Sequence, residues 1–385
     1  MTKKLYDQNP YLHSFTATVV AVVPAGKYYE VYLDQTAFFP ESGGQSADKG
    51  MLSLHPVVDV KETEQGIAHI LALPLTAGET VEGQIDFADR FRKMQVHTAE
   101  HIFSGLAHTL FGCENVGFHL GENEVTCDYD ICLSDEQIRL LEEKTNQAIW
   151  ENRTVSWEYP AEDILSTLPY RSKGELDAPV RIVTIDGYDI CACCAPHVSK
   201  TGEIGGFAVA FHERHRGGTR CYIKAGKDAL LYLRMMQDQL AAVSHRLSVP
   251  PEKVAEGVAR QGEEMAELRQ TIYSLRKTVT EMRIASATPK DGFILFFEAQ
   301  ASQEDMRSVL NGCVERCEKA CGFFVGNDQD GYRFTLSSRH YSMQQLAETL
   351  RNIHSAKCGG TKEMISGTIS LTKEDITAFL KVYLR

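Results

Sequence analysis

The chain has no long apolar run, since no stretch of hydrophobic residues approaches the roughly 20 that a membrane-spanning helix needs. It also lacks an apolar stretch at its start, because residues 1–7 include charged and polar side chains where a secretion signal would be hydrophobic. Positive charge is in deficit: 40 Lys and Arg against 52 Asp and Glu give a formal net charge of -12. We therefore expect a cytoplasmic protein without membrane contact, and no broad, non-specific binding of nucleic acid.

Cysteine is plentiful, but its number and setting do not indicate a disulfide scaffold. The chain has 11 cysteines among 385 residues. An odd number in a long chain without a secretion signal favours free thiols and metal ligands. Hydrophobic residues make up 43% and charged residues 24%, which is typical of a globular protein with two or three domains.

Residue patterns divide the chain into four parts and predict an α+β fold. Residues 1–88 are rich in β-branched residues interrupted by glycine and proline, which predicts a small N-terminal β-barrel. Residues 89–227 should form a metal-binding α/β core. In it we expect a helix from Asp89, as its N-cap, to Phe111, and a second helix that Ser134 opens with a capping box.

Residues 228–286 change to a heptad pattern, with apolar side chains at alternating steps of three and four. Pro250 and Pro251 interrupt this pattern, which predicts a helical hairpin or coiled coil with a proline turn. The seam consists of Leu233, Met236, Leu240, Val243 and Leu247, followed by Met265, Leu268, Ile272, Leu275, Val279 and Met282. Residues 287–385 should form a separate α/β domain, with a helix over Gln303–Ala320 and a glycine loop from Lys357.

Two clusters of metal-ligating residues stand in the predicted core. His97 and His101 lie four apart on a predicted helix, so both imidazoles can reach one ion. Cys193 and His197 lie on a tight loop, and together the four side chains make a plausible tetrahedral zinc set. A closed structural zinc site made of Cys191, Cys193, Cys194 and His197 is a rival, although its spacing is cramped for four ligands of one ion.

The helix motif also matches H-x-x-E-H, the inverted metallopeptidase signature, in which the glutamate is a general base. Glu100 occupies that place. Such peptidases take a glutamate as third ligand, and no second feature of the sequence points to one. A zinc metallopeptidase is therefore an alternative that the residues leave open.

Two local groups of basic residues stand out from the acidic background. The first comprises Arg90, Arg92 and Lys93, and the second includes Arg214, Arg216 and Arg220. Each can be an ordinary solvated surface or a local face for a polyanion. The stretch Thr36–Asp48 is also conspicuous for its paired glycines, and by composition it is a hairpin turn.

Three motifs occur in one order along the chain: Glu41–Gln45 (ESGGQ), His97–His101 (HTAEH) and Cys193–Gly205 (CCAPHVSKTGEIG). Together they resemble the editing half of alanyl-tRNA synthetase and the AlaX-type (long form) alanyl-tRNA editing proteins. Arg216–Arg220 resembles the strand that follows the family's zinc loop. The heptad segment and the glycine loop at Cys358 resemble the synthetase's C-terminal domain of the DHH-associated type, so the resemblance covers nearly the whole chain.

This resemblance implies an editing core, and a zinc-dependent hydrolase that deacylates mischarged tRNA(Ala), above all Ser-tRNA(Ala) and also Gly-tRNA(Ala). It implies the stand-alone form, because no aminoacylation half precedes the barrel. Thr36 and Gln45 would line the pocket and read the serine hydroxyl, while Glu100 and Glu203 are candidates for the general base. One departure is that Cys194-Ala195-Pro196 stands where the family usually has Gly-Gly-Thr.

The implied partner is tRNA(Ala) carrying a wrong amino acid, met by Arg214, Arg216 and Arg220 together with the C-terminal domain. A homodimer through the helical hairpin and the C-terminal domain is also expected. Four protein ligands would close a zinc site, so either one ligand is loose, the ion becomes five-coordinate, or it only positions substrate. A non-catalytic RNA-binding protein with structural zinc remains the third function class.

Overall fold

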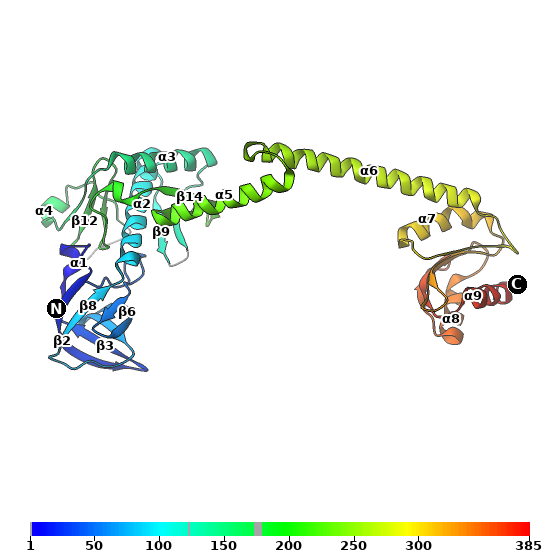
Figure 1. Ribbon diagram of the computed structural model, residues 1–385, viewed down its shortest axis with the longest axis horizontal. Coiled ribbons are helices and arrows are strands. Elements are labelled where there is room, and N and C mark those ends of the chain that lie inside the picture. The colour runs from blue at the N-terminus through cyan, green and yellow to red at the C-terminus, as the bar shows by residue number, and fades with distance from the viewer. Residues whose placement is uncertain (1, 122–123, 173–178) are drawn as a thin grey trace. The chain divides into compact units, whose positions relative to one another are not determined.

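The computed structural model describes residues 2–121, 124–172 and 179–385 of the chain. These residues form two compact units, Met1–Val243 and Ser244–Arg385. Both units mix helices and strands (Figure 1), which confirms the predicted α+β class. No helix among the described residues is long and apolar enough to cross a membrane. The four predicted domain boundaries remain predictions.

Six strands near the start of the chain close into a barrel in the order β2-β3-β7-β6-β5-β8. Their side chains alternate between core and solvent, as β8 illustrates, so valines and leucines fill the interior. Gly26, at φ 65°, makes the tight turn between the first two strands. The strands are β2 (Ser14–Ala25), β3 (Tyr28–Leu33), β5 (Gly50–Leu52), β6 (His55–Thr63), β7 (Gly66–Leu71) and β8 (Thr80–Ile85).

A long helix, α2 (Phe87–Phe111), follows the barrel directly and carries the first of the two predicted metal-binding motifs. It begins earlier than predicted, because Asp86 is the N-cap and accepts a hydrogen bond from the Asp89 amide. Asp89 lies within the first turn, so its predicted capping role was wrong. Gly112 ends the helix in the left-handed conformation at φ 61°, as expected for glycine at that position.

Two sheets and a second helix complete the core around α2. The helix α3 (Asp135–Glu151) begins at Ser134 with the predicted capping box. One sheet has the order β14-β15-β10-β9 and the other β11-β12-β13. Their strands are β9 (Asn115–Leu120), β10 (Val125–Tyr129), β11 (Val155–Glu158), β12 (Ile182–Ile185), β13 (Asp189–Ala192), β14 (Phe207–His215) and β15 (Gly218–Ala225). Short elements are β1 (Lys3–Lys4), α1 (Leu5–Gln8), β4 (Gln35–Thr36) and α4 (Glu162–Leu165).

Two helices occupy the heptad region, α5 (Lys227–Leu247) and α6 (Val254–Ser286). The predicted break falls between them, at Pro250 and Pro251. The seam side chains of α6 are 44–66% exposed, so they cover no core of their own unit.

The second unit contains a five-stranded sheet in the order β16-β17-β18-β20-β19. Helix α7 ends at Cys313, so the predicted continuation to Ala320 was wrong; Ala320 instead opens a strand that pairs with Phe293. The predicted glycine loop is a strand, β19, paired with β20. The elements are β16 (Phe293–Glu298), α7 (Gln303–Cys313), β17 (Ala320–Asn327), β18 (Gly331–Ser337), α8 (Met343–His354), β19 (Lys357–Gly360), β20 (Met364–Ile369) and α9 (Lys373–Tyr383).

Candidate metal centre

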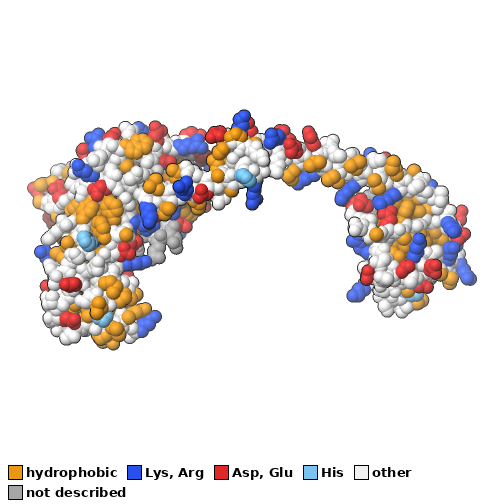
Figure 2. Space-filling view, viewed as in Figure 1, with side chains coloured by type: hydrophobic (Ala, Val, Ile, Leu, Met, Phe, Trp, Pro, Cys, Tyr) orange, Lys and Arg blue, Asp and Glu red, His pale blue; other side chains and the backbone are white. Residues whose placement is uncertain are grey.

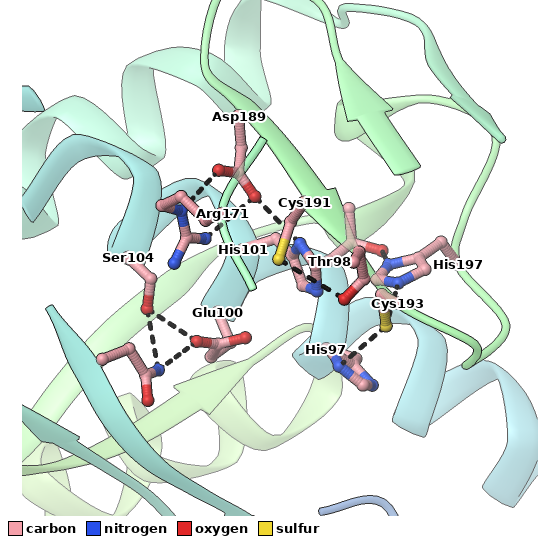
Figure 3. Close-up of polar contacts among 12 residues, drawn as sticks. His97, Thr98, Glu100, His101, Ser104, Arg171, Asp189, Cys191, Cys193 and His197 are labelled. Carbon is pink, nitrogen blue, oxygen red and sulfur yellow. Dashed lines mark hydrogen bonds and ion pairs between the residues drawn. The ribbon is translucent and has the colours of Figure 1, made fainter. Parts of the chain in front are cut away.

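The four predicted ligands converge on one point (Figure 3). Helix α2 presents His97 and His101 one turn apart on the same face. The loop after β13 supplies Cys193 and His197. One ligating atom from each of the four lies within 4.8 Å of all the others, so the fold brings together the two clusters that the sequence keeps 92 positions apart or more.

The separations between these atoms fit a tetrahedral ion. With zinc–nitrogen bonds of ~2.05 Å and zinc–sulfur bonds of ~2.3 Å, a tetrahedral site places nitrogen and sulfur about 3.6 Å apart. The Sγ of Cys193 lies 3.7 Å from Nε2 of His97 and 3.4 Å from Nε2 of His197. The donor set of three imidazoles and a thiolate also matches zinc chemistry.

Each histidine is oriented by a hydrogen bond on the far side of its ring. His97 Nδ1 lies 2.9 Å from Gln45 Oε1, and His101 Nδ1 lies 2.9 Å from Asp189 Oδ2. His197 Nδ1 lies 3.0 Å from Thr98 Oγ1, whose own proton goes to the Met94 carbonyl. Because all three acceptors bind an Nδ1 proton, all three Nε2 lone pairs face the centre, as in protein metal sites.

The electrostatics of the cluster favour a metal-ligating thiolate. Burial would raise the pKa of the Cys193 thiol, but His97 beside it and the nearby imidazoles of His101 and His197 hold that pKa well below its usual range. Burial lowers the pKa of His197 to about 3, so this imidazole is neutral at pH 7. A thiolate and a neutral imidazole are the forms that bind a metal ion.

The rival closed zinc site is not assembled among the described residues. Cys191 groups with His101 and Asp189 rather than with the other cysteines, and burial raises the pKa of its thiol to about 11. Cys194 is exposed, and its Sγ lies 3.2 Å from the Ser42 hydroxyl.

A cavity of about 390 Å³ opens beside the cluster. His97, His101 and Cys193 border it, whereas His197 is fully buried and is not among its described lining residues. The lining also includes four residues that the sequence motifs did not indicate: Lys4, Tyr159, Arg171 and Arg181. Ser42 and Cys194, which belong to the quoted motifs, line the cavity as well. A larger hollow of about 830 Å³ shares Arg171 with it but none of the four ligands.

Glu100 lies in the cavity wall, where the sequence analysis placed a candidate base. Its side chain is only 3% exposed. Oε1 accepts a hydrogen bond from Ser104 Oγ at 2.6 Å (Figure 3) and another from the side-chain amide of Asn115. Glu203, the other candidate, accepts from the Tyr11 hydroxyl and the Lys200 amide and caps a short turn, so its position is structural.

The structure places Thr36 and Gln45 outside the described cavity lining. Thr36 is fully buried in the barrel, with Oγ1 2.8 Å from His69 Nε2. Gln45 is also fully buried and holds His97, while its Nε2 has no hydrogen-bond partner among the described residues. These placements favour a supporting role for both, rather than direct contact with a substrate hydroxyl.

The two basic groups differ in exposure. Arg90 is fully buried and paired with Asp48, and Lys93 is bonded to Asp89. Arg92 pairs with Asp228, so this group is not a solvated basic face.

The second group lies on the hairpin of β14 and β15, where Arg214 and Arg216 are exposed. Arg220 donates two hydrogen bonds to Asp128, at 2.6 and 2.7 Å. The hydrogen bond from Arg220 lowers the pKa of Asp128, so this charge is already paired.

Comparison with known proteins finds similarity to tRNA synthetases in two parts of the chain. Residues 180–220 match the family described as threonyl and alanyl tRNA synthetase second additional domain, and residues 10–89 match tRNA synthetases class II (A). An alanine–tRNA ligase of Pyrococcus abyssi is 29% identical over 99% of this chain and 44% of its own length. One from Natronomonas pharaonis is 32% identical over 82% and 36%. The chain thus spans less than half the length of these ligases.

By these matches the chain is similar to part of an alanyl-tRNA synthetase, and its own structure contains a barrel and a candidate metal centre. A further match runs end to end: the alanyl-tRNA editing protein Aarsd1 of Rattus norvegicus is 24% identical over 98% of this chain and 97% of its own length. The resemblance to the alanyl-tRNA editing proteins is therefore confirmed.

Proposed function

We propose that this chain is a zinc-dependent hydrolase that deacylates mischarged tRNA(Ala), most of all Ser-tRNA(Ala). The observation that carries the proposal is the cluster of His97, His101, Cys193 and His197 beside a cavity large enough for an aminoacyl group. The end-to-end similarity to an alanyl-tRNA editing protein supports it. We also propose that the second unit is a domain of the DHH-associated type, and that the protein acts in the cytoplasm without needing ATP.

The reaction is the hydrolysis of an ester. Water adds to the carbonyl carbon, the bond to the ribose oxygen breaks, and the products are a free amino acid and a tRNA with its terminal hydroxyl restored. When bound, zinc would supply Lewis-acid polarisation of the carbonyl or a water of lowered pKa. Glu100 faces the same cavity, so we assign it to accept a proton from the attacking water, with Ser104 and Asn115 holding its carboxylate.

Selection of serine follows from the limits of a pocket built for alanine. Such a pocket cannot strongly exclude serine, which adds only a hydroxyl, whereas a second site that hydrogen-bonds the hydroxyl can accept serine and reject alanine. Ser42 and Cys194 are polar, line the cavity and lie 3.2 Å apart. We propose that they meet the side chain of the substrate, in the role that the sequence analysis gave to Thr36 and Gln45.

The body of the tRNA would contact the β14–β15 hairpin and the second unit. Arg214 and Arg216 are exposed and suited to phosphate contacts, whereas Arg220 is engaged by Asp128. Phosphate contacts make affinity salt-dependent, so tRNA affinity should fall steeply with salt. An affinity that is independent of salt would contradict this part of the proposal.

We propose that α6 pairs with the same helix of a second copy of the chain. Hydrophobic side chains lie along the surface of this helix (Figure 2). Its seam has Ile272 and Val279 at one heptad position and Leu268 and Leu275 at the other. This arrangement favours two-stranded coiled coils. A single monomeric mass in solution at micromolar concentration would overturn the dimer.

The test of function is hydrolysis of Ser-tRNA(Ala), Gly-tRNA(Ala) and Ala-tRNA(Ala) by purified protein, with and without removal of zinc by a chelator. We expect zinc-dependent loss of the serine ester, with the alanine ester spared. Loss of no ester by fully zinc-loaded protein would refute the proposal in favour of a structural zinc.

Cleavage of peptides separates the deacylase from the peptidase alternative, because Glu100→Gln should impair either reaction. A peptidase of the H-x-x-E-H type needs this carboxylate as its base, but its third ligand would be a glutamate, and the described cluster contains none. Cleavage of a peptide library by the wild type, abolished in Glu100→Gln, would favour the peptidase.

A further inference from the structure

A carboxylate lies directly behind one of the four candidate ligands. Asp189, on β13, accepts a hydrogen bond from His101 Nδ1 at 2.9 Å, and the two side chains are 2% and 4% exposed. The other two histidines are held by the neutral groups of Gln45 and Thr98. His101 is therefore the only one of the three that the described structure backs with a charged acceptor.

The close approach of α2 to β13 creates this contact, and Gly105 permits it. Gly105 follows His101 by four residues, so both lie on the face of α2 turned toward β13. A Cβ at Gly105 would stand 2.4 Å from the Tyr188 carbonyl oxygen and 3.0 Å from Asp189. Only glycine leaves room for the strand to pass close enough to bring Asp189 beneath His101.

Arg171 fixes the carboxylate from the opposite side. Its Nε donates to Asp189 Oδ1 at 2.8 Å and its Nη2 donates to Asp189 Oδ2 at 2.9 Å (Figure 3). The paired geometry of guanidinium and carboxylate sets the plane of the carboxylate, which a single hydrogen bond would leave free to rotate. The Arg171 side chain is 14% exposed, so water screens this pair little.

The backbone of Arg171 also ties the strand that leads into the metal loop. Its amide donates to the Ile190 carbonyl at 2.8 Å, and its carbonyl accepts from the Ala192 amide at 2.9 Å. Arg171 thus forms backbone hydrogen bonds with both chain neighbours of Cys191, which lies two residues before the candidate ligand Cys193. The side chain of Arg171 thus acts, through Asp189, on the orientation of His101, a ligand on the helix. Its backbone fixes the position of the strand that leads to Cys193, a ligand on the loop.

We infer that Arg171 and Asp189 form a positioning pair for the metal centre: Arg171 orients Asp189, and Asp189 holds His101 with its Nε2 toward the ion. The inference rests on the metal site of the proposed function, but not on its substrate or reaction. Outer-shell partners of metal-ligating histidines typically change metal affinity by about 10- to 100-fold when they are removed. Neither residue is a ligand in this arrangement.

The experiment measures zinc affinity of the full chain by competition with a chromogenic chelator, without tRNA. Asp189→Asn should weaken zinc binding about 10- to 100-fold. Arg171→Met should weaken it as well, and the double variant should bind no more weakly than Asp189→Asn, because Arg171 acts through Asp189. The double variant leaves no buried unpaired charge, so it should fold even where a single variant does not.

The matched control is Asp128→Asn, which weakens another two-bond pair of the same unit, the one between Asp128 and Arg220. Its zinc affinity should stay within about twofold of wild type, since it does not contact a ligand. Unchanged zinc affinity in Asp189→Asn would overturn the inference, and so would a double variant whose losses simply add. Failure of the deacylase assay would leave this result intact, which separates the two proposals.

Discussion

Replacing Thr36 with valine distinguishes a pocket residue from a barrel residue. Thr36 Oγ1 donates to His69 Nε2, because His69 Nδ1 is already directed at the Val31 carbonyl at 3.0 Å. The same oxygen accepts from the Phe38 amide at 3.1 Å. Valine has nearly the same shape but neither bonding capacity, so the variant leaves two buried polar groups without a partner.

The expected cost follows from those two groups. Each unsatisfied buried group costs about 1–3 kcal/mol, so Thr36→Val should lower the free energy of unfolding by about 2–6 kcal/mol. For a unit of this size each kcal/mol shifts Tm by about 2–4 °C, which gives a fall of at least about 4 °C. Discrimination between serine and alanine esters should not change, because Thr36 is not among the described cavity-lining residues.

Thr145→Val is the matched control for that variant. Thr145 is equally buried, but among the described residues its hydroxyl bonds only the Leu141 carbonyl of its own helix, so its loss should cost less than about 1 kcal/mol. The assay combines thermal unfolding with hydrolysis of the two esters. Unchanged Tm in Thr36→Val, together with lost discrimination, would refute the reasoning and return Thr36 to the substrate pocket.

Three other predictions concern pH, metal and packing. Burial lowers the pKa of His69 to about 4, so as pH falls the unfolded chain binds a proton at this residue before the folded chain does. The free energy of unfolding should therefore fall by about 3 kcal/mol between pH 6.5 and 4. Urea unfolding of His69→Leu should not show this fall. Zinc at 100 times its Kd should stabilise the wild type by about 2.7 kcal/mol and leave Cys193→Ser nearly unaffected in a thermal shift assay. Gly105→Ala should lower both Tm and zinc affinity, because its Cβ would clash with β13; a Tm equal to wild type would show that the helix shifts freely.

Much of the local structure follows from short-range patterns. The capping box at Ser134 sets the start of α3, and Gly112 ends α2. Such signals act within a few residues, so the sequence displays them directly. The end of α7 did not follow from its pattern, because the pairing of Ala320 with Phe293 decides it, and that pairing is a long-range contact.

The sequence by itself indicated the candidate ligand set, since two imidazoles one helical turn apart and a thiolate four residues before an imidazole are a pattern typical of zinc sites. Only the tertiary structure decided which side chains surround that set. In the folded chain Thr36 lies in the barrel core, Gln45 hydrogen-bonds His97, and Asp189, which Arg171 holds, hydrogen-bonds His101. A few neighbouring residues are enough to indicate the type of ligand. The contacts that orient the ligands join segments far apart in the chain, and only packing brings those segments together.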